Sequence, residues 1–238
     1  MKILLAPAET KKEGGENLPL QKNIFFYSDE IIDSYETLVT SATTEELSTW
    51  FGIKKLSDVE KYQRSIKNLP TMKAIERYTG VAFEALDYNN LDEVSKKFVD
   101  THVMLFSNLF GILKADDNIP EYKFKQGVIL PTINQEKYYK EHLKEKLDIY
   151  LGDEILDLSS GYYQKYYKPT TSVITYKFLK GGKVVSHWAK HYRGEMVRQI
   201  ALNKIESFAQ LMNFKFDGLQ LQEIQEKKNI KTIIMEIK

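Results

Sequence analysis

The sequence predicts an α/β fold of the mixed α+β kind: an irregular mixed sheet with flanking helices and an embedded helix–hairpin–helix. Strand-like and helix-like stretches alternate irregularly along the chain, which favours a mixed sheet over a regular parallel one. Two apolar runs are joined by Gly181-Gly182, the pattern of a tight antiparallel hairpin. No internal repeat, low-complexity tract or Ser/Gly-rich linker divides the 238 residues, so we expect one domain over residues 1–238.

The chain is expected to open with a short buried strand at Lys2–Leu5, which Pro7 ends. A loop over residues 11–26 follows. Ser28 is a suitable N-cap for the next element, because apolar residues recur behind it at helical spacing as far as Val39.

Two capping-box patterns then lie close together, T-T-E-E at residues 43–46 and S-D-V-E at residues 57–60. The stretch between them, residues 51–55, is long enough only for a turn. Residues 44–66 are therefore predicted to form a helix, a tight hairpin and a second helix.

This segment has the pattern of a DNA-binding motif. In such motifs the amides at a helix N-terminus meet a phosphate and nearby lysines add charge, a role available here to Lys54 and Lys55. The usual hairpin has two glycines, whereas this one keeps Gly52 and has Lys54 at the second position. The alternative interpretation is an ordinary pair of packed helices.

The remaining elements follow from the same periodicities. Helices are expected from Asn90 onwards, over residues 134–151, and over a long apolar face that runs from Met196 to Met212. Strands are expected at residues 103–106, 110–113, 154–158, 172–179, 183–188 and 232–237.

The formal net charge of +1 hides a strongly uneven distribution of charge. Residues 160–215 carry 10 basic and 2 acidic side chains, a balance of 10 − 2 = +8, so the rest of the chain sums to −7. Tyrosines and one tryptophan are interleaved with the basic residues of this block. Basic and aromatic groups together suit a phosphate backbone and exposed bases, and the alternative is a solvated surface paired with the acidic remainder.

Composition excludes several classes of function. The chain has no cysteine, which rules out disulfides, thiolate nucleophiles and cysteine-based metal sites. No apolar run is long enough for a membrane span, and the N-terminal apolar stretch is too short for a signal peptide. His187 and His191 have the spacing of two zinc ligands, but His187 falls at an expected strand end, so we expect no metal and no cofactor.

Several motifs, in order along the whole chain, resemble those of the bacterial peroxide stress protein YaaA family. The first is Ala6-Pro7-Ala8-Glu9-Thr10, which resembles S-P-A-K-T, and the sharpest is Ala189-Lys190-His191-Tyr192-Arg193-Gly194-Glu195-Met196 with Arg198, which resembles A-K-x-A-R-G-x-M-x-R. The other matching blocks are Tyr78-Thr79-Gly80, Phe106–Lys114 with Asp117, Tyr122, Lys123 and Gly127, Asp157-Leu158-Ser159-Ser160 with Tyr163 and Lys165, and Asp217-Gly218.

The chain departs from the family pattern at polar positions. Glu9 stands where the family has lysine, although Lys11 lies nearby. Lys114 and Lys123 replace arginine, which keeps the charge but loses the bidentate geometry, and Asp157 replaces asparagine.

The resemblance implies a cytoplasmic protein that limits oxidative damage linked to unincorporated iron. It also implies DNA binding through a helix–hairpin–helix and a positively charged cleft in an unusual α/β fold. We therefore expect largely sequence-independent contacts to duplex or branched DNA and no membrane. The residues expected to make these contacts are Lys54, Lys55, Lys114, Lys123, Lys165, Lys190, Arg193 and Arg198.

The alternative is an enzyme that acts on a nucleotide or nucleobase. Polar residues concentrated in the matching blocks suggest a pocket, whereas contacts to DNA alone would need only charge. Lys190 or Tyr163 would transfer a proton there, and Arg193 would hold a phosphate. The expected pocket residues are Thr10, Ser107, Asp157, Ser159 and Tyr163. A protein-interaction module resting on exposed tyrosines is a third and weaker hypothesis.

Overall fold

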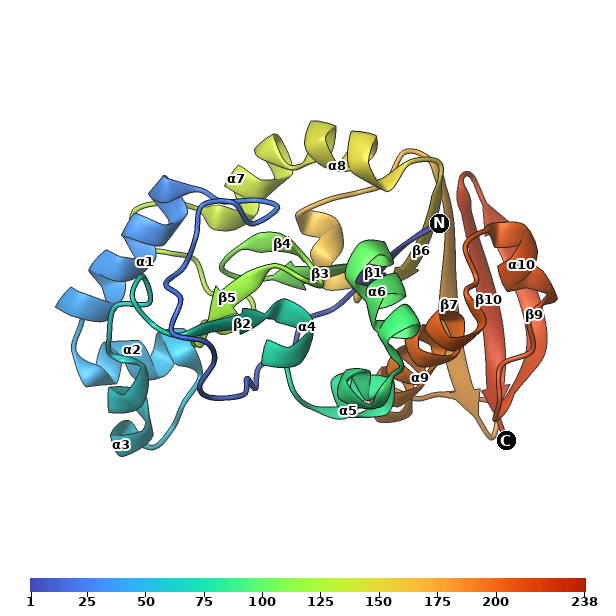
Figure 1. Cartoon of the computed structure of the whole chain (residues 1–238), viewed down its shortest axis with the longest axis horizontal. Helices are drawn as coiled ribbons and strands as arrows, with labels where there is room; N and C mark the ends of the chain where they lie inside the picture. Colours follow the sequence, from blue (N-terminus) through green and yellow to red (C-terminus); the bar gives the residue numbers. More distant parts are fainter.

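The computed structural model describes all of residues 1–238 and is built around a mixed sheet of eight strands. The order is β4-β3-β1-β6-β7-β10-β9, with β8 paired to β7 outside this path (Figure 1). The five strands from β3 to β10 run parallel, and β4, β8 and β9 are antiparallel to their neighbours. The strands are β1 Lys2–Leu5, β3 Val103–Ser107, β4 Gly111–Lys114, β6 Glu154–Leu158, β7 Ser172–Lys180, β8 Lys183–Val184, β9 Leu219–Lys227 and β10 Ile230–Ile237. The predicted mixed α/β class is confirmed.

Helices flank the sheet on both sides. In Figure 1, α7 and α8 lie along the top of the view and α5 and α9 along the bottom, with the central strands between them. A second sheet of two strands, β2 Thr71–Lys73 and β5 Asn118–Pro120, lies towards the end that carries α1 and α2. The helices are α1 Asp29–Ser41, α2 Thr44–Phe51, α3 Leu56–Val59, α4 Ala74–Arg77, α5 Val81–Leu86, α6 Glu93–His102, α7 Gln135–His142, α8 Lys144–Leu151, α9 His187–Asn203 and α10 Phe208–Asn213, with short 3-10 turns at Glu60–Tyr62, Tyr88–Asn90 and Gly161–Lys165.

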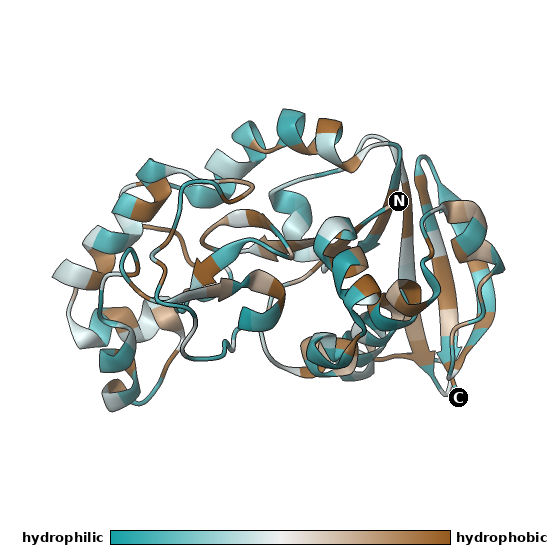
Figure 2. Cartoon of the chain, viewed as in Figure 1, coloured by the Kyte–Doolittle hydropathy of each residue, from teal (hydrophilic) through white to brown (hydrophobic).

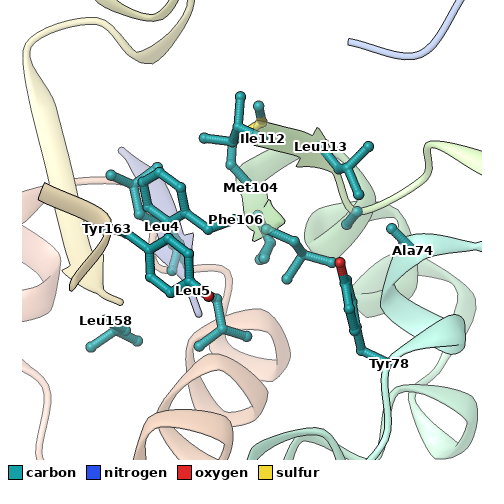
Figure 3. Packing of buried hydrophobic residues seen from close by; sticks show 14 of the residues in the cluster. Leu4, Leu5, Ala74, Tyr78, Met104, Phe106, Ile112, Leu113, Leu158 and Tyr163 are labelled. Atoms are coloured by element: carbon teal, nitrogen blue, oxygen red, sulfur yellow. The ribbon is translucent and has the colours of Figure 1, made fainter. Parts of the chain in front are cut away.

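The core is centred on β1 and β3, whose apolar side chains are buried on both faces because helices cover both. The hydropathy colouring shows this contrast between apolar inner strands and mixed outer helices (Figure 2). At the carboxyl end of β1, Leu5 packs close to Phe106 and Tyr163 (Figure 3). The rings of Phe106 and Tyr163 stack with their centroids 4.8 Å apart. No helix of the structure is both long and apolar enough to cross a bilayer.

The segment predicted as helix, hairpin and helix has a well-formed first half. The capping box of α2 is confirmed: the Thr43 hydroxyl accepts from the Glu46 amide, and the Glu46 carboxylate accepts from the Thr43 amide. Gly52 ends α2 at φ +67°, a left-handed conformation that suits glycine.

The second half of that segment differs from the prediction. The capping box at Ser57 is wrong, because α3 begins at Leu56 behind Lys55, which offers no side-chain cap. The helix α3 is a single turn that passes directly into the 3-10 turn Glu60–Tyr62.

Several element boundaries also differ. The helix predicted over residues 134–151 is two helices that meet at Leu143, and α6 is capped by Asp92, two residues after the expected start. The predicted strand 183–188 ends at Val184, so that His187 begins α9.

The long helix predicted to reach Met212 stops at Lys204, which adopts a left-handed conformation and separates α9 from α10. The edge strand β9 was not expected, because its mostly polar sequence lies at the exposed edge of the sheet and shows no buried pattern.

Candidate functional site

A cavity of about 330 Å³ lies at the carboxyl ends of β1 and β6. The chain leaves β1 towards β3 on one side and leaves β6 towards β7 on the other, so the order of connection reverses between β1 and β6. In open α/β sheets this reversal opens a crevice that binds ligands. The cavity is lined by Leu5, Ala6, Pro7, Ala8, Glu9, Thr10, Thr79, Gly80, Val81, Ala82, Phe83, Asn108, Gln126, Leu158, Tyr163, Lys190 and Arg193.

The loop after β1 forms one wall and is tied to the segment that precedes α5. The Thr79 amide donates to the Thr10 carbonyl at 3.1 Å, and the Thr10 hydroxyl donates to the Thr79 carbonyl at 3.2 Å. Gly80 has φ +102°, and a Cβ there would meet the Thr10 hydroxyl at 3.5 Å. The positive φ therefore favours glycine here, whereas the space beside it would admit an ordinary Cβ contact.

The opposite wall is α9, which is packed tightly against α5. A Cβ on Gly194 would lie 1.8 Å from the carbonyl oxygen of Ala82, so only glycine fits between the two backbones. Lys190 and Arg193 are one turn and one residue before Gly194 in α9 and line the cavity. The close approach of the two helices thus determines where these two cations lie.

Neither cation has a carboxylate within ion-pair distance. The Nε of Arg193 is buried and has no hydrogen-bond partner. Burial lowers the pKa of Arg193, and the nearby Asp157 carboxyl acts in the opposite direction. A desolvated guanidinium with an open donor is suited to an anionic ligand, phosphate above all.

Two hydrogen-bonded groups complete the polar lining. The Tyr163 hydroxyl donates to Asn108 Oδ1 at 3.1 Å, and the Asn108 amide donates to the Phe124 carbonyl at 3.4 Å. Burial holds the pKa of Tyr163 far above its ordinary value, so this phenol stays protonated at neutral pH. Tyr163 can therefore donate or accept a hydrogen bond at this site, but it cannot act as a general base at neutral pH.

Comparison with known proteins identifies the chain. The family model described as Peroxide stress protein YaaA matches residues 1–225. The chain belongs to the YaaA family. An uncharacterised protein of Campylobacter jejuni is 40% identical over 100% of this chain and 99% of its own length. A UPF0246 protein of Corynebacterium glutamicum is 33% identical over 87% of both chains, and one of Finegoldia magna is 27% identical over 99% of this chain and 100% of its own.

In this YaaA-family chain, Asp157 and Ser159 flank the cavity-lining Leu158 but do not line the cavity themselves. The Ser159 hydroxyl donates to Asp157 Oδ1 at 2.6 Å, and the Ser159 amide donates to the same oxygen at 2.9 Å. Burial raises the pKa of the Asp157 carboxyl, which Ser159 and the charge of Arg193 oppose. These contacts give the pair a role in shaping the turn after β6.

Ser107 lies deeper, at the end of a chain of three hydroxyl groups. Its Oγ accepts from the amides of Leu109 and Phe110, which fills both lone pairs, so its proton is directed to the Tyr122 hydroxyl 2.8 Å away. The Tyr122 proton is then directed to the Tyr78 hydroxyl, also at 2.8 Å. Ser107 was expected in the pocket, and the structure places it in this buried network instead.

The eight residues expected to bind DNA separate into two groups. Lys190 and Arg193 line the cavity, and Lys54 is exposed; none of the three is in an ion pair. The other five are paired, at 3.3–3.8 Å: Lys55 with Asp58, Lys114 with Asp116, Lys123 with Glu9, Lys165 with Glu136 and Arg198 with Asp87.

Two of these residues do not occupy the expected cleft. Lys114 pairs in register with Met104 near the amino end of β3, whereas the cavity lies at the carboxyl ends of the strands. Arg198 points away from Arg193, as the helical spacing predicts, and also donates to the carbonyls of Leu86 and Asp87 at 3.0 Å. Neither Lys114 nor Arg198 lines the cavity.

Glu9 stands where the family has lysine, and here it accepts from the Gln126 amide at 3.3 Å and pairs with Lys123. Asn108 and Gln126 were not singled out from the sequence, although Asn108 lies inside a matching motif. His187 and His191 both belong to α9, contrary to the predicted strand end, and the structure contains no cluster of three or more potential metal ligands.

Proposed function

We propose that this peroxide stress protein binds DNA, largely without regard to sequence, through cationic groups at the cavity. The observation that carries the proposal is the pair Lys190 and Arg193, two cations on one helix that have no carboxylate within ion-pair distance. An arrangement of this kind attracts phosphate, because its charge is not already satisfied within the protein. The family supports the role in peroxide stress.

The segment 44–66 would supply a second phosphate contact. In support of this, Gly52 turns the chain sharply after α2, and the exposed Lys54 in that turn has no carboxylate partner. Bound protein would shield DNA from damage linked to unincorporated iron. The effect on iron would be indirect, since the chain offers no thiolate to hold it.

Fluorescence anisotropy with a labelled duplex and a four-way junction tests the proposal. We expect Lys190→Ala and Arg193→Ala each to weaken binding to both by about 5- to 10-fold, the value of ~1–1.4 kcal/mol for one charged contact. Lys114→Ala is the matched control, because it removes a lysine from the opposite edge of the sheet. Unchanged affinity in both cavity variants contradicts the proposal.

A second candidate is an enzyme that acts on a nucleotide or nucleobase, and the specific observation in its favour is the cavity itself. Its position at the reversal point of the sheet and its volume suit a nucleotide-sized ligand. Arg193 would hold the phosphate, the pair Tyr163 and Asn108 would meet the base, and Lys190 would move a proton. A calorimetric titration with nucleoside monophosphates tests it: we expect binding that Arg193→Ala abolishes, and no heat with any nucleotide counts against it.

A further inference from the structure

Lys11 differs from two other half-buried lysines of the chain, Lys61 and Lys73. Lys61 and Lys73 are each paired with a carboxylate, Glu121 at 2.9 Å and Asp100 at 2.7 Å, and these contacts raise the pKa of both amines. Lys11 has no carboxylate within ion-pair distance, and its amine donates only a long hydrogen bond to the Ala8 carbonyl, at 3.5 Å.

Aromatic rings surround this amine in place of carboxylates. The Nζ of Lys11 lies 4.1 Å from the centroid of Tyr122 and 5.1 Å from that of Tyr78. Their hydroxyl groups belong to the hydrogen-bonded network that ends at Ser107. The ring faces attract a cation only weakly, while burial between them removes water from the amine and disfavours its charge.

The charged groups near Lys11 do not offset the effect of burial on its protonated form. Burial is the largest influence and Lys123 and Arg77 add to it, whereas Glu9 and Glu121 act in the opposite direction. Together they lower the pKa of Lys11 from 10.5 to about 7. A large fraction of the molecules therefore carries a neutral, nucleophilic amine at neutral pH.

Lys11 lies beside the cavity, although it is not one of the residues that line it. It follows directly on Thr10, and the carbonyl that it approaches belongs to Ala8; both residues line the cavity. The other side of the same cavity carries Lys190 and Arg193. The loop after β1 thus holds this amine next to the cavity that Lys190 and Arg193 line, two cations without a carboxylate at ion-pair distance.

We propose that Lys11 forms a Schiff base with the carbonyl group of a phosphorylated sugar whose phosphate is held by Lys190 and Arg193. The neutral Nζ adds to the carbonyl carbon, and a proton from the amine passes to the carbonyl oxygen. Protonation of the resulting hydroxyl expels one water and leaves an iminium. The chemistry rests on the phosphate site of the proposed function, and it fits both a free sugar phosphate and the open-chain sugar of an abasic nucleotide in DNA.

Reductive trapping tests the proposal. The full chain is incubated with 2-deoxyribose 5-phosphate and sodium cyanoborohydride, and the adducts are mapped by peptide mass spectrometry. We expect the main adduct on Lys11, at least 10-fold above any exposed lysine, with a rate that rises through pH 7 and levels off above it. Labelling spread evenly over the exposed lysines overturns the proposal without any need for a variant.

Two substitutions test whether the adduct forms on Lys11 itself. Lys11→Arg keeps the positive charge but cannot form an imine, so the main adduct should disappear. Lys12→Arg changes the neighbouring exposed lysine and should leave trapping unchanged. An equal yield of adduct in Lys11→Arg and the wild type overturns the assignment to Lys11.

A second experiment replaces the free sugar phosphate by a duplex with one abasic site. Sodium cyanoborohydride again traps the adduct, and a denaturing gel measures the amount of covalent complex. A complex lost in Lys11→Arg identifies the sugar in DNA as a source of the carbonyl, and adducts with the free sugar phosphate alone identify the small molecule. If intact duplex binds but neither probe is trapped, the Lys11 proposal is wrong and DNA binding stands. If the free sugar phosphate is trapped on Lys11 but no duplex binds, DNA binding is wrong and the Lys11 proposal stands.

Discussion

Pairing with carboxylates divides the basic residues of this chain into two groups. Lys165 and Arg198 belong to the basic block, yet each is held by an acidic partner, Glu136 or Asp87. Lys190 and Arg193, from the same block, have none. A ligand that binds at the second pair breaks no existing ion pair, so its full electrostatic attraction contributes to affinity.

The pKa of Lys11 leads to a prediction on stability. The amine has a pKa of about 7 in the folded chain and 10.5 as its ordinary value, so between these limits the unfolded chain binds more protons. The free energy of unfolding of the wild type should therefore rise with pH in this window, relative to Lys11→Met, by about 1–3 kcal/mol. Urea unfolding of both proteins at pH 7, 8.5 and 10 measures the difference, and parallel curves would contradict it.

The identity of the basic residues at the site was easier to predict from the sequence than their contacts in the folded chain. Lys190 and Arg193 could be named from the motif, because their block is both basic and matched to the family. The position of Lys114 could not be predicted, because it depends on the antiparallel return of β4, which carries this lysine to the amino end of β3. Nor could the sequence show that Lys11 would lie against two tyrosines distant in sequence.

At the scale of elements, the contact between α5 and α9 fixes the geometry of the site. Ala82 lines the cavity from α5, and Lys190 and Arg193 line it from α9. Gly194 sets the distance between them. A change in this single contact should disturb stability and ligand binding together.

Gly194→Ala is expected to lower the free energy of unfolding by about 2–3 kcal/mol, because its Cβ would overlap the Ala82 carbonyl and push the helices apart. The same shift should weaken phosphate binding. Gly161→Ala is the matched control: a Cβ there meets nothing within 4 Å, so the change should stay within about 0.5 kcal/mol. Denaturant unfolding measures the stability of both variants, and fluorescence anisotropy measures their binding to DNA. Equal stability of the two variants would show that α5 and α9 are not closely packed.

The capping box of α2 gives a second test at this scale. Thr43→Ala removes the hydroxyl that accepts from the Glu46 amide and should cost about 1 kcal/mol, whereas Thr43→Ser should retain most of it. Thermal unfolding measures both variants. A Thr43→Ser variant as unstable as Thr43→Ala would show that the hydroxyl is not the stabilising group.

Most elements with a strong local signal were predicted well, and those fixed by packing were not. Ser28 and Thr43 cap their helices as the sequence predicts, since a cap is a contact over three residues. The Gly181-Gly182 turn joins β7 to β8 for the same reason. The break at Lys204 was missed although Ser207 and Gln210 form a capping box at the start of α10, a local signal of the same kind.

At the scale of the molecule, the number of unpaired cations predicts the salt dependence of DNA binding. Contacts from Lys54, Lys190 and Arg193 alone give a slope of log affinity against log salt of about −2.7, from ~0.9 per phosphate contact. All eight expected residues would give about −7 by the same relation. Fluorescence anisotropy at salt concentrations between about 50 and 200 mM distinguishes the two slopes. A slope near −7 would mean that DNA binding breaks the ion pairs of the other five residues.

The position of the cavity also belongs to this scale. The sequence indicated which residues were polar and which were strand ends, but the reversal between β1 and β6 follows from the order of the strands. That order places Leu5 next to Leu158 across more than half of the chain. Only the assembled sheet brings the two ends together.

The central position of β1 has a consequence for synthesis of the chain. Ile3 pairs with Val103 on one side and with Leu156 on the other, so neither neighbour exists when β1 leaves the ribosome. At ~5–20 residues per second, the first partner follows after about 5–20 s and the second later still. For that interval an apolar strand has both edges unpaired and open to pairing with other chains. The sheet around β1 can be completed only after β6 has been synthesised, so its central contacts are among the most distant in sequence.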